Sequence, residues 1–319
     1  MADDGPIRIT IPPDASGATV LQIAAEALGS QAEAQRVLER GGLWVNRARV
    51  RDALATVSAG DTVFIHRPPD GVYAEVTFDP AWVIYEDADL LAVNKPAGVY
   101  VEATPWDAVA HLRGAVERYL ERRLATEGAG TEAPNAPARS AVHLVHRLDR
   151  DTTGVLLLSK SPAVNAPLQH AFESGEVRKE YVCLCAGEPA WETLTVETGH
   201  GRMRQGLWRV YPLDEVGRVL PGGSRVKLMV TRFVVERRLG DAALVRAYPL
   251  SGRTHQIRLH LAHLGHPLLG DARYGGPAEW RGRSIPHHLL HAARLELPHP
   301  RTGQPLVLSA PLPPWASFE

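Results

Sequence analysis

The amino-acid sequence predicts an α+β fold, in which a large domain on a mainly antiparallel, mixed sheet follows a small N-terminal αβ domain. With 319 residues, the chain is long enough to bury more than one hydrophobic core. Residues 17–66 contain two helix-like segments followed by short strands. The chain beyond residue 82 contains many short apolar segments and few helices, which is typical of an antiparallel sheet. Because segment 67–71 reads as a linker, we expect domains at residues 1–70 and 71–319.

The small domain is expected to begin with two short helices. Apolar residues recur at helical spacing over 21–28, and Ser30 is a suitable N-cap for a second helix, which the glycine pair starting at Gly41 would end. Extended segments follow at 43–46 and 62–65. This order of elements predicts a compact αβ unit.

The large domain is expected to be a succession of strands with two helices. Asp107 is the expected N-cap of one helix, with an apolar stripe from Val109 to Leu124, and the second helix is expected over 163–173. Residues 124–140 are rich in Gly, Ala and Pro and are expected to form a flexible insertion. The expected strands, read from apolar runs, are 83–87, 90–95, 155–158, 180–184, 226–230 and 243–248.

Composition narrows the class of protein. Hydrophobic residues make up 45% of the chain, and no apolar run is long enough to span a bilayer. The N-terminal residues lack the apolar core of a signal peptide, so we expect a cytoplasmic protein without a membrane partner. Cys183 and Cys185 lie on one face of an expected strand, which excludes a disulfide framework. The formal net charge is −1, so any binding to nucleic acid has to depend on local basic clusters.

Residues 146–154, with the sequence HRLDRDTTG, concentrate charge next to an apolar run. Asp149 and Asp151 lie among arginines, the final residues read as a turn, and 155–158 reads as a buried strand. Such a loop holds carboxylates at the edge of a core, where solvent still reaches them. The alternative is a loop stabilised by its own salt bridges.

Four strings in this chain resemble those of the RluA family of pseudouridine synthases. HRLDRDTTG at 146–154 is similar to that family's signature, in which the Asp is the indispensable residue. RKEY at 178–181 and SGRTHQIRLH at 251–260 follow it, and NKPAG at 94–98 precedes it. After NKPAG the family continues with Val-His-Pro, whereas this chain continues with Val-Tyr-Val, so a role of that loop in substrate contact is open. The resemblance spans residues 80–314 and implies the pseudouridine synthase fold.

The resemblance implies an enzyme that isomerises specific uridines in structured RNA to pseudouridine, without a metal or other cofactor. Large-subunit ribosomal RNA is the first expected substrate, and transfer RNA is the second. By resemblance, Asp149 is the catalytic carboxylate, and Arg258 is the permanently charged residue that keeps it ionised. Tyr181 matches the active-site aromatic, which can stack on uracil and serve in the final deprotonation. Whether Asp149 attacks the ring, attacks the sugar or removes a sugar proton is open.

A set of RNA-binding residues also follows from resemblance. The target uridine has to leave the base stack, and Arg147 matches the family position that fills the gap. The string RGGLWVNR at 40–47 resembles an S-four-type RNA-binding domain, for which the alternative is a small domain with a solvated basic face. For His146, a packed structural position is an equal alternative. The expected RNA-binding residues are Arg147, His146, Lys179, Arg253, Arg36, Arg40 and Arg47.

Two other functions fit parts of the sequence. A non-catalytic RNA-binding protein could retain this fold, although all three expected active-site residues are present. A metal-dependent hydrolase could use the histidine cluster His255, His260, His263 and His266. Because these histidines do not all share one helix face and no nearby carboxylate completes the set, we expect no metal site. We also expect a monomer.

Overall fold

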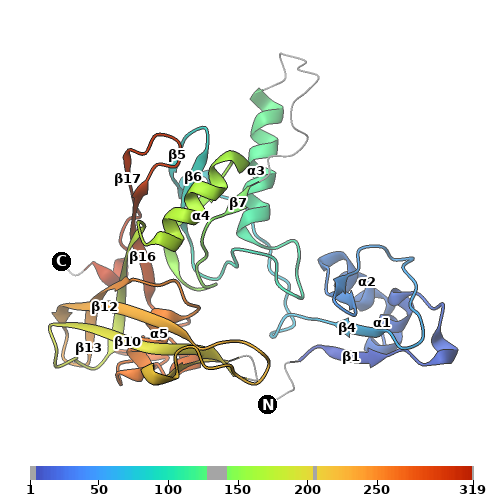
Figure 1. Cartoon of the computed structure of the whole chain (residues 1–319). Coiled ribbons are helices and arrows are strands. Elements are labelled where there is room, and N and C mark those ends of the chain that lie inside the picture. Colours follow the sequence, from blue (N-terminus) through green and yellow to red (C-terminus); the bar gives the residue numbers. More distant parts are fainter. Residues whose placement is uncertain (1–4, 128–141, 204–206, 318–319) are drawn as a thin grey trace. The chain divides into compact units, whose positions relative to one another are not determined.

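The computed structural model describes residues 5–127, 142–203 and 207–317, and its chain forms two compact units (Figure 1). Each unit has a hydrophobic core of its own. Within the described ranges, the helices are too short or too polar to cross a lipid bilayer. The units are Met1–Phe78 with Val99–Arg139, and Asp79–Gly98 with Ser140–Glu319.

The described part of the first unit contains a four-stranded antiparallel sheet and three α-helices. Its strands lie in the order β1-β4-β2-β3. The core is formed by apolar side chains of two helices and the sheet, such as Val20, Val37 and Val63. The elements are β1 Ile7–Thr10, α1 Val20–Leu28, α2 Gln31–Arg40, β2 Leu43–Val45, β3 Ala48–Arg49, β4 Thr62–Ile65 and α3 Leu112–Glu127.

Both helices predicted for the small domain are confirmed, and each begins and ends with a recognisable cap. Thr19 and Gln22 form a capping box at the start of α1. The Ser30 hydroxyl accepts a hydrogen bond from the Glu33 N–H at 3.2 Å, which starts α2. Gly41 ends α2 with a φ of 81°, a conformation that glycine adopts without steric cost.

The first unit includes a segment beyond the domain boundary expected at residue 70. The Trp44 indole donates a hydrogen bond to the Pro105 carbonyl at 2.9 Å, and the Arg49 guanidinium donates to the Thr104 carbonyl at 2.6 Å. These bonds tie the segment that precedes α3 to strands β2 and β3. A division at residue 70 would therefore separate groups that are bonded to each other. The S-four-type character of residues 1–70 stays a prediction.

The helix predicted after Asp107 begins only at Leu112. The Asp107 carboxylate accepts hydrogen bonds from the N–H groups of Val109 and Ala110 at 2.8 and 3.0 Å, so it caps a turn that precedes the helix. Because α3 continues to Glu127, the first residues of the insertion expected at 124–140 are helical. The rest of that prediction lies outside the described residues.

The described part of the second unit is built on an eleven-stranded mixed sheet. Its main path has the order β11-β10-β12-β13-β9-β16-β8-β6-β5, with β17 beside β16 and β7 beside β8. The strands are β5 Val83–Glu86, β6 Leu90–Lys95, β7 His143–Leu144, β8 Thr153–Ser159, β9 Arg178–Ala186, β10 Thr193–Arg202, β11 Trp208–Tyr211, β12 Lys227–Arg238, β13 Ala242–Pro249, β16 Leu290–Pro298 and β17 Pro305–Ser309.

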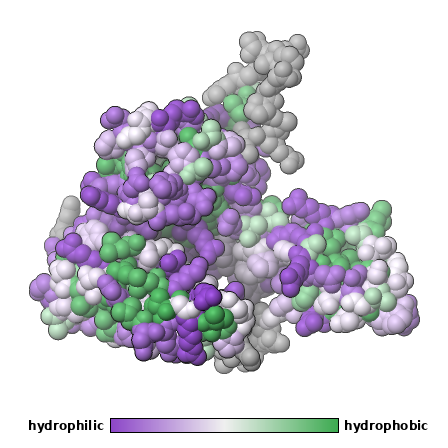
Figure 2. All heavy atoms as spheres, viewed as in Figure 1, coloured by the Kyte–Doolittle hydropathy of each residue, from purple (hydrophilic) through white to green (hydrophobic). Residues whose placement is uncertain are grey.

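The predicted α+β class with a mainly antiparallel, mixed sheet is confirmed. Among the described strands of this sheet, only β8 and β16 pair in parallel. Helix α4 (Asn165–Ser174) packs its apolar side on β6 and β8, and helix α5 (Gln256–His263) packs on β9, β12 and β13. A separate hairpin joins β14 (Glu279–Trp280) to β15 (Arg283–Ser284). Figure 2 shows apolar residues gathered over the part of this unit that contains β10, β12 and β13.

Strand β8 positions the charged loop that the sequence singled out. The predicted buried strand is confirmed, since Val155 to Leu158 are all at most 1% exposed. At its start, Gly154 has a φ of 102°, and a Cβ placed there would lie 2.2 Å from the Ala292 carbonyl oxygen of β16. Glycine is therefore required where the charged loop meets the parallel pair of strands.

Candidate active site

His146 fixes the first part of the loop between β7 and β8. Its Nε2 accepts a hydrogen bond from the Leu157 N–H at 2.9 Å, and its ring stacks on Phe172 of α4. Burial lowers the pKa of His146 to about 3, and the charge of Lys179 adds to this effect, so the imidazole is neutral and able to accept. This arrangement favours the packed position for His146 over an RNA contact.

Lys95 fixes the second part of the same loop. This fully buried side chain donates hydrogen bonds from Nζ to the carbonyls of Pro96 and Arg150 at 2.8 and 2.7 Å. Burial lowers the pKa of Lys95 to about 7, an effect that the charges of Asp151 and Asp149 partly oppose. The loop is thus bonded on both sides of Asp149.

Arg258 joins Asp149 to a second, deeper carboxylate. Its Nη1 donates to Asp149 Oδ2 at 2.8 Å, while Nε and Nη2 donate to the two oxygens of Asp271 at 2.7 and 2.9 Å. Side-chain exposure is 1% for Asp271, 8% for Arg258 and 25% for Asp149. The outer carboxylate is therefore the accessible end of a chain of three charged groups. The predicted pairing of Arg258 with Asp149 is present.

The second oxygen of Asp149 faces His255. The distance from His255 Nε2 to Asp149 Oδ1 is 3.8 Å, and His255 Nδ1 forms a 2.7 Å hydrogen bond with the Tyr274 hydroxyl. His255 is the residue before α5 and has a φ of 57°, which is unusual for a side chain with a Cβ. The Arg258 guanidinium lies 5.1 Å from the centre of the Tyr274 ring, so these residues surround Asp149 as one cluster.

The cluster keeps Asp149 ionised. Burial acts to raise its pKa, but His255, which becomes charged in acid, together with the charge and hydrogen bond of Arg258, outweighs burial and holds that pKa below its usual range. Burial lowers the pKa of His255 to about 4, so its imidazole is neutral near pH 7. Burial also opposes the charge of Arg258, yet its bonds to Asp271 and the charge of Asp149 raise its pKa. At neutral pH, Arg258 is therefore the permanent cation beside the carboxylate.

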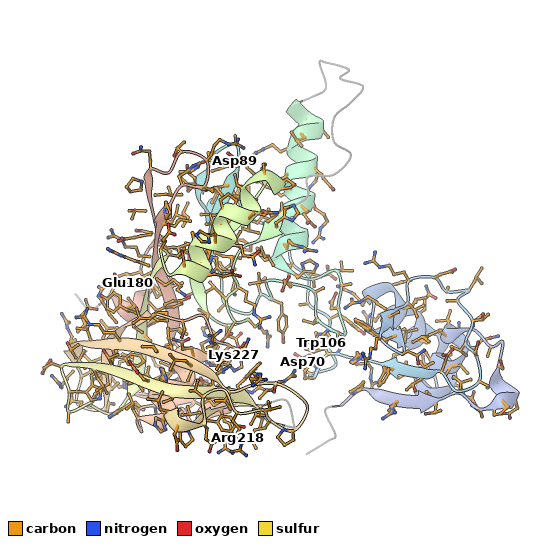
Figure 3. The ribbon with its side chains drawn as sticks, in the orientation of Figure 1. Asp70, Asp89, Trp106, Glu180, Arg218 and Lys227 are labelled. Atoms are coloured by element: carbon orange, nitrogen blue, oxygen red, sulfur yellow. The ribbon has the colours of Figure 1, made fainter. Side chains whose placement is uncertain are left out.

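Tyr181 lies on β9 at the edge of the core that α5 covers. Burial raises the pKa of its phenol, and the charge of Asp149 adds to the effect, so the hydroxyl stays protonated at neutral pH. Its neighbour Glu180, labelled in Figure 3, forms an ion pair with Arg246 on the adjacent strand. Because successive side chains of a strand point to opposite faces, Tyr181 faces α5 and the Asp149 side.

Two histidines near the start of β16 hold the end of the charged loop. His288 Nε2 forms a hydrogen bond with the Thr152 hydroxyl at 2.9 Å, and His291 Nδ1 forms one with the Thr153 hydroxyl at 2.8 Å. Burial lowers the pKa of each imidazole to about 4. At neutral pH both histidines are therefore uncharged, and they hold the end of the loop through hydrogen bonds to Thr152 and Thr153.

The cluster offers an ionised, partly exposed carboxylate next to a protonated aromatic side chain, which suits nucleophilic or proton-transfer chemistry on a flat ring. Comparison with known proteins decides the class of reaction. Residues 89–263, more than half of the chain, match the RNA pseudouridylate synthase family. The chain belongs to this family. It is an RNA pseudouridine synthase, an isomerase that converts uridine to pseudouridine, and the resemblance seen in its sequence is confirmed.

Curated relatives of this synthase match over most of their length. It is 43% identical to RNA pseudouridine synthase 1 of Arabidopsis thaliana over 267 residues, which cover 74% of this chain and 76% of that protein. It is 32% identical to ribosomal large subunit pseudouridine synthase C of Escherichia coli strain K12 over 291 residues, which cover 87% of this chain and 83% of that protein.

Solved structures share the fold of this synthase. Human RNA Pseudouridylate Synthase Domain Containing 1 aligns with a TM-score of 0.52 at 26% identity, covering 74% of this chain and 85% of that chain. Human RNA Pseudouridylate Synthase Domain Containing 4 aligns with a TM-score of 0.54 at 23% identity, covering 74% and 90%. The second of these likenesses concerns the fold alone.

The predicted RNA-binding residues of the second unit lie close to the synthase's catalytic cluster. Arg147 is exposed, and its Nη2 donates to the Thr254 hydroxyl at 3.2 Å. Lys179 Nζ donates to the Ser251 carbonyl at 3.4 Å, and burial together with the charge of Arg253 lowers the pKa of Lys179. These three cations thus gather around the segment that leads into α5.

The predicted RNA-binding residues of the first unit differ in their surroundings. Arg36 and Arg47 are exposed. Arg40 is 16% exposed, forms ion pairs with Glu75 and Asp107, and lies 5.3 Å from the centre of the Tyr73 ring. Arg40 is therefore engaged within the unit, which favours a structural role over an RNA contact.

The histidine cluster considered as a metal site is dispersed among separate partners. His260 is bonded to the hydroxyls of Thr198 and Thr231, and His266 Nδ1 is bonded to the Ala186 carbonyl. Among the residues that the structure describes, no three His, Cys, Asp or Glu side chains are placed to hold a metal ion.

Sequence reasoning did not assign a role to Asp271, Tyr274 or Lys95 of this synthase. Asp271 and Tyr274 lie in the stretch GDARYG, where an acidic residue and an aromatic residue between glycines were a usable signal. Lys95 was visible as a single charge at the end of an apolar strand. His255 was noticed within the family string at 251–260 and in the histidine cluster, but it was given no role in the site.

Proposed function

We propose that this synthase modifies uridines of large-subunit ribosomal RNA, with Asp149 as its catalytic carboxylate. The observation that carries the role of Asp149 is the 2.8 Å hydrogen bond from Arg258, which is itself held by the buried Asp271. The choice of RNA is supported by the relative named ribosomal large subunit pseudouridine synthase C, which matches 87% of this chain. Transfer RNA is the second candidate substrate. A cytoplasmic location and a monomeric state stay predictions.

In the proposed reaction the bond between the sugar and N1 of uracil breaks, the uracil turns, and its C5 forms the new bond to the same sugar carbon. The proton on C5 is then lost and N1 gains one, so the product is an isomer of uridine. Asp149 acts as an ionised group, because Arg258 stays protonated and its positive charge stabilises the carboxylate. The open routes are attack on the ring, attack on the sugar and removal of a sugar proton.

Tyr181 is proposed to stack on the uracil while it turns. Its raised pKa keeps the phenol protonated at neutral pH, so we assign it no part in the final deprotonation that the resemblance implied for Tyr181. An aromatic ring held on a core strand offers a flat surface for a flat base.

The test is site-resolved pseudouridine mapping on total RNA from cells with and without this protein. Cells that produce Asp149→Asn should lack at least one pseudouridine that the intact protein restores. Asp151→Asn is the matched control, because Asp151 lies in the same loop and pairs with Arg150 rather than with Arg258. It should retain the modification. A site in transfer RNA would redirect the substrate, and full modification by Asp149→Asn would refute the role of that residue.

A further inference from the structure

The free edge of the large sheet carries a stacked pair of rings near the candidate active site. Trp208 of β11 lies over His200 of β10, with ring centres 4.5 Å apart and planes within 14° of parallel. His200 is 4% exposed, whereas Trp208 is half-buried, so Trp208 is the outer ring. The Arg202 guanidinium lies 5.8 Å from the centre of the Trp208 ring. An aromatic ring backed by another ring presents a rigid flat face.

The stacked rings are bonded to the segment that leads into α5. His200 Nε2 forms a 3.0 Å hydrogen bond with the Thr254 carbonyl, and the Thr254 hydroxyl accepts from Arg147 at 3.2 Å. Thr254 directly precedes His255, which faces Asp149. One residue therefore connects the edge of the sheet to both the predicted intercalating arginine and the catalytic cluster.

Positive charge surrounds the stacked rings. The strand register places Lys227 of β12 opposite His200, and Arg253 Nε donates to the Leu228 carbonyl at 3.1 Å. After burial, the charges of Arg253 and Lys227 contribute to lowering the pKa of His200. Figure 3 labels Lys227 at the start of its strand.

These cations are not neutralised by acidic neighbours. Within the described ranges, no carboxylate forms an ion pair with Arg147, Lys179, Lys227 or Arg253. The sequence as a whole has a formal net charge of −1, so this concentration of positive charge is a local property. Groups that repel one another in this way gain stability when a polyanion lies across them.

We infer that Trp208, His200, Lys227 and Arg253, here called the Trp208 surface, bind a single-stranded RNA segment that lies next to the modified uridine. Trp208 stacks on an unpaired base, and Lys227 and Arg253 contact the phosphates of that strand. An acidic protein segment would form ion pairs with the cations but would have no base to stack on the ring. Aromatic rings interleaved with cations are typical of proteins that bind single-stranded nucleic acid. The inference deepens the proposed function and rests on it for the place of the uridine.

The binding test uses the full chain and a fluorescent oligoadenylate, which contains no uridine and therefore cannot be turned over. Trp208→Leu, which keeps the apolar bulk and removes the ring, should weaken binding about 10-fold, the size of one lost base–aromatic stack. Trp208→Phe should restore most of the affinity. Trp280→Leu is the matched control, because Trp280 also lies against an arginine, at 4.5 Å, but on the β14–β15 hairpin.

The charge test uses the dependence of the same affinity on salt. Lys227→Gln should reduce the slope of log Kd against log salt concentration by about 0.7, the contribution of one phosphate contact to a single strand. Arg209→Gln is the matched control, since Arg209 neighbours Trp208 but points to the opposite face of β11. Equal losses in Lys227→Gln and Arg209→Gln would overturn the assignment to this face.

Activity separates this inference from the proposed function. With an RNA that contains the target uridine, Trp208→Leu should raise KM about 10-fold. The single-turnover rate at saturation should be unchanged, because the lost stack affects binding and not the chemical step. An inactive wild-type protein that still shows the binding differences would refute the proposed function alone. Unchanged oligoadenylate binding by Trp208→Leu, or equal competition by polyglutamate, would overturn the inference while leaving the function intact.

Discussion

The orientation of Asp149 depends on Asp271, a buried residue that acts through Arg258. Arg258 uses two of its donors on Asp271 and a third on Asp149, so its guanidinium has a fixed plane and a fixed direction. Asp271 is 1% exposed and lies behind Arg258. It is therefore a positioning residue, whose function is to aim the cation at the catalytic carboxylate.

Asp271→Asn should lower the single-turnover rate about 100-fold. Without its anchor the Arg258 guanidinium can shift, and a misplacement of about 1 Å in a reacting group costs about that much in rate. RNA affinity should be unchanged, because Asp271 is buried beneath the site. Single-turnover reactions of purified protein with a transcribed RNA, quenched at set times and repeated at several protein concentrations, measure both the rate and the RNA affinity. Asp241→Asn, which removes an exposed carboxylate paired with Arg281, is the control. A rate like that of the wild type would show that Arg258 needs no anchor.

At the scale of elements, two turns at one end of the second unit are held together by charge. The Asp87 carboxylate, in the turn between β5 and β6, accepts hydrogen bonds from the Tyr85 hydroxyl at 2.6 Å and from His299 Nε2 at 2.8 Å. Arg301, in the turn between β16 and β17, forms a forked pair with Asp89, which Figure 3 labels in its own turn. These bonds connect two hairpins that are distant in sequence.

Asp87→Asn should lower the free energy of unfolding by about 1–3 kcal/mol, the cost of leaving partly buried donors poorly paired. The pKa of Asp87 is lowered to about 2, because bonds from Tyr85, His299 and two main-chain N–H groups outweigh the opposing effect of burial. A depressed carboxylate pKa gives stability that is present above the unfolded value and is lost as pH falls toward 2. Urea unfolding at pH 7 and pH 3 measures this. The exposed Asp214→Asn should behave as wild type.

Local patterns predicted the elements that depend on neighbours in sequence. The capped helices α1 and α2, the β5–β6 hairpin and the buried strand β8 all follow from spacing and turn residues. Strands β10 and β11 were not predicted, because Gly199 and Gly201 weaken a strand pattern. They are needed there, since a Cβ on Gly199 would lie 2.6 Å from Val226 and one on Gly201 would lie 2.6 Å from Leu220.

The site was predictable where a resemblance supplied it and not where only packing defines it. Asp149 and Arg258 lie 109 positions apart, and no periodicity brings them together; the family strings did. The stretch GDARYG marks Asp271 as a candidate residue, but only the packing of the turn before Tyr274 places its carboxylate against Arg258. His146 and Arg40 were assigned to RNA by charge and position, whereas their partners in the fold explain both.

At the scale of the whole molecule, the second unit buries several neutral histidines. His260, His288 and His291 are at most 4% exposed, and burial lowers the pKa of each to about 4. Their hydrogen bonds go to threonine hydroxyls, which can donate to a neutral ring. Protonation of any of them would place an unpaired charge in the core.

The unfolding free energy of the second unit should fall as pH is lowered from 6.5 toward 4. In this window the histidines are protonated in the unfolded chain and neutral in the folded protein. Each buried histidine therefore adds about 1.4 kcal/mol per pH unit to the slope of the unfolding free energy against pH. Stability should be flat with respect to these groups above pH 6.5. Urea unfolding at several pH values tests the sign. His260→Gln should make the curve shallower, and the exposed His170→Gln should not; identical slopes for both would contradict the assignment.

Strand β16 lies between β9 and β8, and it is the strand through which the main path of the sheet connects its two sides. On one side of it lie β9, β13, β12, β10 and β11, and on the other lie β8, β6 and β5. During translation, the two sides emerge from the ribosome long before residues 290–298 do. The pairing of β16 with β8 and with β9, which joins the two sides, can therefore form only after this late strand has been synthesised.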